Sequence, residues 1–190
     1  TSVPHYPGVP VETWWDLGIG DSTTIWFAQR VGQEIHLIDY VEDNGKGLPH
    51  YAALLQEKQR ANGYVYGDHV WPHDGGHEQL ATGESLADTF RRLGYSAMVL
   101  ERTDIAPGID RVRNTLPRCW FDAVRCERGI EALRNYRTEW DDDKKTFKPK
   151  PLHDWSSHGA DAFRYLAMTF DSVGNRAFTR RIEMPRMGVA

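Results

Sequence analysis

The segment between residues 13 and 41 restricts the possible folds of this chain more than any other part. Three short runs rich in β-branched and aromatic residues occupy positions 13–17, 23–29 and 34–41, and only a few turn residues separate them. Strands joined by connections this short pair as antiparallel neighbours. The segment therefore predicts a three-stranded antiparallel meander.

Beyond the meander, helical and strand patterns alternate along the chain. Helical spacing and end signals predict helices over residues 49–62, 85–93, 105–116, 127–139 and 157–170, with Ser85 capping the second and Ser156 or Ser157 the last. Short apolar runs predict strands at 69–72, 95–100 and 119–121, and the charged segment 140–151 is expected to form a hairpin or loop. This order predicts a mixed α/β fold of the ribonuclease H-like type, with one sheet flanked by helices.

The length of 190 residues and the hydrophobic content of 40% fit one domain with a substantial core. We expect a linker at residues 1–12, the folded domain at 13–172 and a flexible tail at 173–190. The sequence contains no apolar stretch near the roughly 20 residues that span a membrane, and no signal-peptide pattern. Because the chain does not begin with Met, we interpret it as the C-terminal part of a longer protein. Cys119 and Cys126 are expected to be reduced.

Three aspartates lie far apart in the sequence but near the ends of predicted elements. Asp16 lies within the first apolar run, Asp74 follows the run VWPH, and Asp161 lies in the helical segment HGADAFRYLAM. A charge such as Asp16, in a segment that should be buried, is costly unless it binds a metal or accepts hydrogen bonds. Each also has a purely structural interpretation: Asp16 caps a turn, Asp74 belongs to an Asp-Gly turn, and Asp161 lies in a first helical turn, where the dipole favours it.

Carboxylates that converge from two strands and a helix suit a pair of hard divalent cations, Mg²⁺ or Mn²⁺. Two such ions, about 4 Å apart, supply an activated water and charge neutralisation at the leaving oxygen, which are the needs of phosphodiester hydrolysis. The sequence therefore predicts a metal-dependent nuclease, with Asp16, Asp74 and Asp161 as catalytic residues and metal ligands.

Four further residues are candidate contributors to this site. Asp21 is either an auxiliary metal ligand or a cap of the turn after the first strand. His73 is expected to support the carboxylate beside it, and His158 and Asp154 to support or extend the site from the last helix.

Other chemistries find little support in the sequence. His69, His73 and His77 are spaced by four, which on a helix would suggest zinc, but the intervening proline and glycines are incompatible with that helix. The sequence contains neither a P-loop motif nor a G-x-S-x-G nucleophile elbow.

Four segments together resemble the nuclease domain of tailed-phage large terminase subunits. They are WDLGIGDSTTIWF, VWPHDGG, RVRNTLPRCWFDAVRCERGIEALRNYR and SSHGADAFRYLA, in this order, and the resemblance covers roughly residues 13–170. It implies an endonuclease that cuts concatemeric viral DNA during genome packaging, in the host cytoplasm. It assigns the catalytic acids to Asp16, Asp74 and Asp161, and an extra acid of some members to Asp21. It also implies double-stranded DNA as the substrate and, in the full-length protein, an N-terminal ATPase domain, a portal, a small terminase subunit and a capsid as partners.

Two other classes remain open from the sequence. One is another ribonuclease H-like nuclease, of the resolvase or transposase type. The other is a catalytically degenerate DNA-binding module, which a failure of the three aspartates to converge would favour.

Basic charge is concentrated in one part of the chain. Residues 1–110 carry 7 basic and 16 acidic side chains, whereas residues 111–150 carry 11 basic and 7 acidic ones. A basic surface beside an acidic metal site is expected of an enzyme that acts on DNA, although a solvated helix face would give the same counts. The candidates for phosphate contacts are Lys144, Lys145, Lys148, Arg111 and Arg113, with Arg118, Arg125, Arg128, Arg134, Arg137 and Lys150 as further contributors. We favour the hairpin lysines, although the acidic run 141–143 opposes them.

Overall fold

One six-stranded mixed sheet forms the centre of the computed structural model, which describes residues 1–18, 21–77, 83–102, 105–142 and 144–173. The strands are β1 (Val11–Asp16), β2 (Ser22–Val31), β3 (Glu34–Asn44), β4 (Tyr66–Trp71), β5 (Ala97–Val99) and β6 (Cys119–Phe121), in the spatial order β5-β4-β1-β2-β3-β6. The first three strands are antiparallel to one another, as the short turns predicted. The other three pair in parallel, β4 with β1, β5 with β4 and β6 with β3. The predicted ribonuclease H-like arrangement is thereby confirmed.

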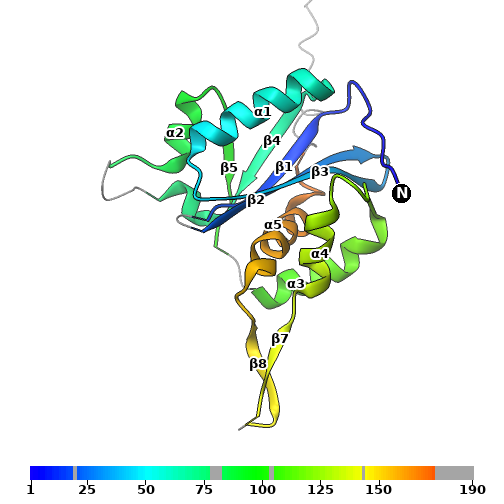
Figure 1. Cartoon of the computed structure of the whole chain (residues 1–190), viewed down its shortest axis with the longest axis vertical. Coiled ribbons are helices and arrows are strands. Elements are labelled where there is room, and N and C mark those ends of the chain that lie inside the picture. Colours follow the sequence, from blue (N-terminus) through cyan, green and yellow to red (C-terminus); the bar gives the residue numbers. More distant parts are fainter. Residues whose placement is uncertain (19–20, 78–82, 103–104, 143, 174–190) are drawn as a thin grey trace, which may run out of the picture.

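Helices cover both faces of the sheet (Figure 1). The helices α1 (Leu48–Asn62) and α2 (Leu86–Arg92) lie on one face, and α3 (Ile105–Thr115), α4 (Glu127–Asn135) and α5 (Trp155–Thr169) lie on the other. Two short 3₁₀ turns, η1 (His73–Gly76) and η2 (Leu116–Arg118), follow β4 and α3. The hairpin of β7 (Thr138–Asp141) and β8 (Thr146–Pro151) projects away from these layers between α4 and α5.

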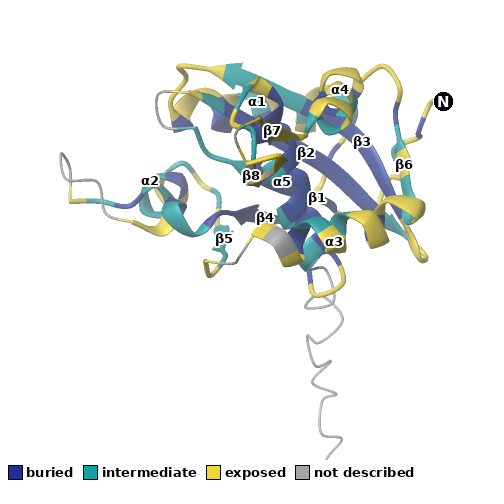
Figure 2. Cartoon of the chain, turned by 90° about the horizontal axis from the view of Figure 1, so that it is seen from below, coloured by how far each residue is buried: buried dark blue, intermediate teal, exposed yellow. Residues whose placement is uncertain are grey.

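Side chains of the central strands alternate between the two faces of the sheet, and each face has its own hydrophobic core. Successive side chains of a strand point to opposite faces. Trp14 accordingly packs with Trp26 and Phe163 beneath α5, whereas Trp15 packs with Trp71 on the α1–α2 side. Figure 2 shows the central strands as the buried part of the molecule and the outer helix faces as the exposed part.

Several predicted boundaries were wrong, among them the following three. The helix predicted over 127–139 ends at Asn135, because residues 138–141 pair with β8 and the ladder bonds outweigh local helical preference. The last helix starts at Trp155, and its N-cap is Asp154 rather than Ser156 or Ser157. The strand predicted over 69–72 begins at Tyr66, since Tyr66 already pairs with β1.

Two expectations about composition can be compared with the structure. Cys119 and Cys126 are both free thiols, and burial raises the pKa of Cys119 to about 12, so it is an unreactive side chain. Among the described residues, the helices are too short or too polar to cross a bilayer. The predicted tail lies outside the described residues from position 174 onwards.

Candidate active site

Asp16 lies at the end of a buried central strand. It follows the fully buried Trp14 and Trp15 and pairs with Thr24 of β2, and its side chain is only 17% exposed. Burial raises the pKa of the Asp16 carboxyl, a hydrogen bond from His158 opposes the rise, and the charges of nearby carboxylates add to it. The position costs free energy for an anion unless positive charge compensates it.

Asp74 emerges at the same edge of the sheet. Because β4 runs parallel to β1 as its direct neighbour, the carboxyl ends of the two strands meet there. The chain then enters η1, where a Cβ on Gly75 would lie 2.8 Å from the Trp71 ring, so only glycine fits beside Asp74 in this turn. Asp74 Oδ1 is buried and has no hydrogen-bond partner among the described residues. A buried carboxylate oxygen in this state is suited to a cation.

Asp161 approaches from α5, which three polar contacts fasten to the sheet. Thr24 Oγ1 donates to the carbonyl of His158 at 3.0 Å, Trp26 Nε1 donates to the carbonyl of Gly159 at 2.9 Å, and Trp14 Nε1 donates to Thr169 Oγ1 at 2.8 Å. These contacts fix the position of α5 along β2 and along β1, which carries Asp16.

Arg164 holds the Asp161 carboxylate in place. The buried guanidinium donates to Asp161 Oδ1 through Nη2 at 3.0 Å and Nε at 3.3 Å. A Cβ on Gly108 of α3 would lie 2.6 Å from the Arg164 side chain, so that glycine makes room for it. Asp161 Oδ1 is therefore committed to Arg164, which leaves its other oxygen for a further partner.

The structure brings the three predicted aspartates into one electrostatic neighbourhood. Asp161 and Asp74 both raise the pKa of Asp16, in addition to burial. Burial also raises the pKa of Tyr165, and the charges of Asp16, Asp161 and Asp74 all add to that shift. Three carboxylates from β1, η1 and α5 thus gather at one edge, as a site for divalent cations requires.

His158 connects this edge to Asp21. Its Nδ1 lies 2.9 Å from Asp16 Oδ2 and its Nε2 lies 3.1 Å from Asp21 Oδ2. The hydrogen bond to Asp16 raises the pKa of His158, against the effect of burial. Asp21 also accepts from the Ser22 amide at 2.8 Å, so it caps its turn and faces the site at once.

His153 joins the same cluster and was missed in the sequence. One possible ligand atom each of Asp21, His153 and His158 lies within 4.8 Å of the others. The H-x₄-H spacing of the two histidines matches no single helix face, and His153 precedes the helix. The spacing does fall within the range of zinc-binding histidine pairs, although no closely spaced cysteine pair accompanies it. The pairing depends on how α5 meets the β1–β2 turn, which local pattern does not encode.

Three other predicted residues have different surroundings. The His73 ring packs near His77, and no described hydrogen bond joins it to Asp74. Asp154 caps α5 by accepting from the Ser156 amide at 2.9 Å. Among the described residues, no hydrogen bond joins it to the three carboxylates. His69 is buried and hydrogen-bonded to Thr13, and burial lowers its pKa to about 4, so it belongs to the core rather than to a zinc site.

Several of the predicted phosphate-binding residues pair with acidic side chains. Arg111 and Arg118 both approach Asp171, and Arg113 lies 3.1 Å from Asp110. In the hairpin, Lys144 and Lys145 are exposed, and Lys148 lies 2.5 Å from Glu139 on the facing strand. The side chain of Lys150 lies outside the described part of the structure.

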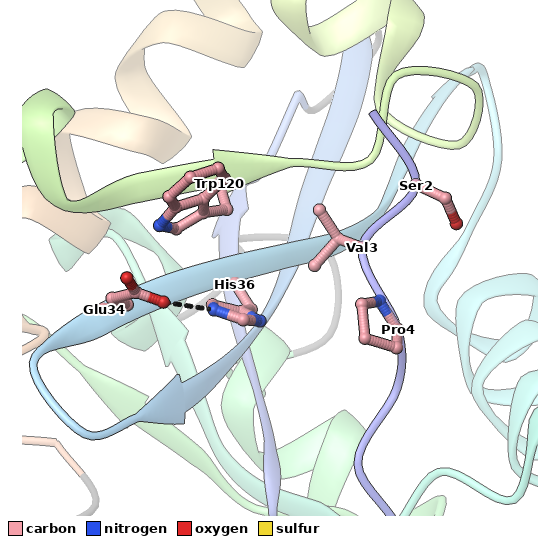
Figure 3. A pocket seen from close by; sticks show the side chains of 6 residues that line it. All are labelled: Ser2, Val3, Pro4, Glu34, His36 and Trp120. Atoms are coloured by element: carbon pink, nitrogen blue, oxygen red, sulfur yellow. Dashed lines mark hydrogen bonds and ion pairs between the residues drawn. The ribbon is translucent and has the colours of Figure 1, made fainter.

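A pocket of about 220 Å³ lies far along the sheet from these carboxylates. Its lining residues are Ser2, Val3, Pro4, Glu34, His36 and Trp120 (Figure 3). Glu34 and His36 belong to the start of β3, which runs parallel to β1 with β2 between them, whereas Asp16 ends β1. The pocket is therefore separate from the candidate active site.

Comparison with known proteins gives matches in structure only. The sequence matches no protein-family model and no curated protein. The nuclease domain of the large terminase of bacteriophage P22 superposes with a TM-score of 0.61 at 18% identity, covering 91% of this chain and 88% of that one. The SPP1 large-terminase nuclease domain, solved with bound manganese, gives 0.60 at 15% identity, covering 85% and 86%. This chain has the fold of a large-terminase nuclease domain.

The same fold occurs within longer large terminases. A large terminase from a thermophilic bacteriophage matches with a TM-score of 0.65 at 16% identity, and the match covers 89% of this chain but 42% of that one. The chain thus spans about two fifths of the length of that protein. The sheet order and flanking helices agree with the large-terminase nuclease domains, as the sequence motifs predicted.

Proposed function

We propose that this chain is a metal-dependent DNA endonuclease that cuts concatemeric viral DNA during genome packaging. The observation that carries the proposal is the gathering of Asp16, Asp74 and Asp161 at one edge of the sheet, where the carboxylates raise the pKa of Asp16 and one buried Asp74 oxygen has no described partner. The likeness of the fold to phage large-terminase nuclease domains supports the same function.

The donor set suits Mg²⁺ or Mn²⁺, which prefer carboxylate oxygens and retain several waters. Asp16, Asp74 and Asp161 would hold two such ions, and Asp21 is an auxiliary ligand. The SPP1 nuclease domain was solved with manganese, which agrees with this choice. When bound, such ions supply an activated water and stabilise the leaving oxygen of the phosphodiester.

The remaining site residues orient the carboxylates. His158 donates to one oxygen of Asp16 and so limits its rotation, and Arg164 does the same for Asp161. Positioning of this kind keeps metal ligands in a productive geometry before the substrate arrives. The duplex is the proposed substrate, and its phosphates would meet the basic residues between 111 and 150.

We further propose that the activity serves a packaging machine in the host cytoplasm. Its other parts would be an ATPase domain, a portal and a small terminase subunit. These partners concern the longer protein, because this chain corresponds to 42% of the length of the large terminase that it matches.

Plasmid cleavage tests the proposal. The protein is expected to nick and linearise supercoiled DNA with Mg²⁺ or Mn²⁺, and EDTA is expected to abolish cleavage. Asp16→Asn, Asp74→Asn and Asp161→Asn should each lower the rate by at least about 100-fold, since even residues that only support metal ligands contribute 10- to 100-fold. Asp21→Asn should lower it less.

The matched control is Glu57→Gln, which neutralises an exposed carboxylate of α1, on the face of the sheet opposite α5. Its rate should equal that of the wild type. A wild-type rate in any of the three main variants would remove that residue from the site. If the wild-type protein binds duplex DNA but cleaves it with neither metal, the chain is a DNA-binding module instead.

A further inference from the structure

The cluster of Asp21, His153 and His158 has a different donor set from the three carboxylates. Asp21 lies in the connection between β1 and β2, and the two histidines flank the start of α5. One candidate ligand atom from each residue lies within 4.8 Å of the others. The cluster therefore offers two imidazoles and one carboxylate to a single point beside the edge of the sheet.

The hydrogen bond of His158 to Asp16 presets one of these imidazoles for metal binding. An ionised carboxylate can only accept, so His158 Nδ1 must carry the proton that Asp16 Oδ2 accepts at 2.9 Å. By the same rule Nε2 donates to the Asp21 carboxylate, whose Oδ2 lies 3.1 Å away, so His158 bridges the two acids while both ring nitrogens carry protons. A metal ion that replaces the Nε2 proton would bind at this nitrogen while Nδ1 still donates to Asp16. Metal-bound histidines commonly show this arrangement, with the second nitrogen donating to a carboxylate.

Ser157 presets the other imidazole in the same way. Its hydroxyl donates to the carbonyl of Asp154 at 2.7 Å, so the oxygen accepts from His153 Nδ1 at 3.1 Å. His153 Nε2 is then the nitrogen with the lone pair. Each histidine thus has an Nδ1–H that donates to a partner outside the cluster, Asp16 for His158 and Ser157 for His153.

We propose that Asp21, His153 and His158 bind one transition-metal ion, of the Zn²⁺ and Co²⁺ class, at a position separate from the carboxylate-only site. Imidazole nitrogen suits these ions, whereas Mg²⁺ strongly prefers oxygen. Ligand atoms at 2.0–2.1 Å from a tetrahedral ion are about 3.3 Å apart, close to the 3.1 Å between His158 and Asp21. His153 is exposed and can close the remaining gap, and three protein ligands leave one position for water.

Asp16 connects this position to the proposed nuclease site. One of its oxygens accepts from His158, while the carboxylate as a whole faces Asp74 and Asp161. A metal on His158 Nε2 would therefore hold the ring, and through it Asp16, in one orientation. The inference shares Asp16 and Asp21 with the proposed nuclease site, but it concerns binding and does not need cleavage to occur.

Cobalt binding tests the inference without reference to cleavage. Tag-free protein is titrated with Co²⁺ in saturating Mg²⁺ at mildly alkaline pH, and the visible absorption of bound Co²⁺ is followed. One Co²⁺ per chain should bind, Zn²⁺ should displace it and Mg²⁺ should not. His153→Ala and Asp21→Asn should each weaken Co²⁺ binding by at least about 10-fold.

Two controls separate this site from its neighbours. His77→Ala, which removes another exposed histidine near the sheet edge, should leave Co²⁺ affinity unchanged. Asp74→Asn should also retain Co²⁺ binding although it loses cleavage, so failure of the nuclease proposal and failure of this one are distinct results. The inference is overturned if Mg²⁺ displaces all Co²⁺, or if both His153→Ala and Asp21→Asn bind Co²⁺ as the wild type does. Because both altered side chains are exposed, the variants should fold, and thermal melting checks this; His153→Gln repeats the test with a side chain of similar size.

Discussion

Two acidic residues of β1 are largely shielded from solvent, but in different surroundings. Asp16 ends the strand among other charges, whereas Glu12 is 7% exposed and lies near its start. The Glu12 carboxylate fills the space over Gly67, where a Cβ would lie 2.4 Å from it, and accepts a hydrogen bond from the Asp68 amide. Burial raises the pKa of Glu12 to about 7, against that hydrogen bond.

The raised pKa of Glu12 makes stability depend on pH with a definite sign. The unfolded chain ionises Glu12 near its ordinary value of 4.5, whereas the folded protein retains the proton until about pH 7. The stabilising contribution is therefore complete below the unfolded value and is lost as the pH rises towards 7.

Glu12→Gln should therefore stabilise the folded protein at pH 8 and leave its stability nearly unchanged at pH 4.5. The amide oxygen can still accept from Asp68 but carries no charge. The expected gain at pH 8 is about 1–3 kcal/mol, since each pKa unit corresponds to about 1.4 kcal/mol. Urea unfolding at the two pH values measures it, with Glu57→Gln on the exposed side of α1 as the control. Equal stabilities of Glu12→Gln and the wild type at pH 8 would show that burying the ionised carboxylate does not lower the free energy of unfolding.

At the scale of elements, the position of α4 depends on a glycine contact with the sheet. A Cβ on Gly129 would lie 2.4 Å from Trp26 Cη2 and 2.8 Å from Tyr40 Cδ2. Trp26 is fully buried and is tied to α5 through the Gly159 carbonyl, so it cannot move aside easily. The close approach of α4 thus depends on the missing side chain.

Gly129→Ala should destabilise the protein by about 1–3 kcal/mol, the usual effect of overpacking a core, even though alanine favours helices by about 1 kcal/mol. Urea unfolding measures the change, and Glu131→Ala on the exposed face of α4 should change stability by less than about 0.5 kcal/mol. An increase in stability for Gly129→Ala would mean that α4 shifts to accommodate the methyl group, and the tight contact would then not position the helix.

The sequence predicted most elements, because their signals are local. The meander follows from its short turns, and Ser85 caps α2 as its position indicated, with its side chain accepting from the Asp88 amide. Local sequence signals gave the wrong prediction where contacts between distant segments determine the structure. Residues 138 and 139 continue a helical pattern but belong to β7 and its pairing with β8, and His153 reaches Asp21 only because α5 docks on β2. The approach of Asp74 to Asp16 follows from the parallel pairing of β1 and β4, whereas the contact of Ser157 with His153 has no local sequence signal.

At the scale of the whole molecule, the charged hairpin extends the surface beside the candidate site. It leaves the layered body between α4 and α5 (Figure 1), and α5 carries Asp161 and His158. A projection at this end could contact the phosphates that flank a bound scissile bond. The exposed Asp142 and the pairing of Lys148 with Glu139 reduce its net positive charge.

Replacing Lys144, Lys145 and Lys148 together with Gln should weaken duplex binding and its dependence on salt. Each lost phosphate contact should flatten the slope of log affinity against log salt by about 0.9, because fewer counterions are released. Binding is measured over a salt series with the Asp74→Asn background, so that the DNA stays intact. The control replaces Lys46, Arg91 and Arg92 with Gln, which removes the same total charge. These three residues are exposed around α1 and α2, across the sheet from α5. The control should keep the wild-type slope, because net charge alone does not make phosphate contacts. If the hairpin variant also keeps that slope, the lysines are solvated and the duplex must follow the arginines of α3 and α4 instead.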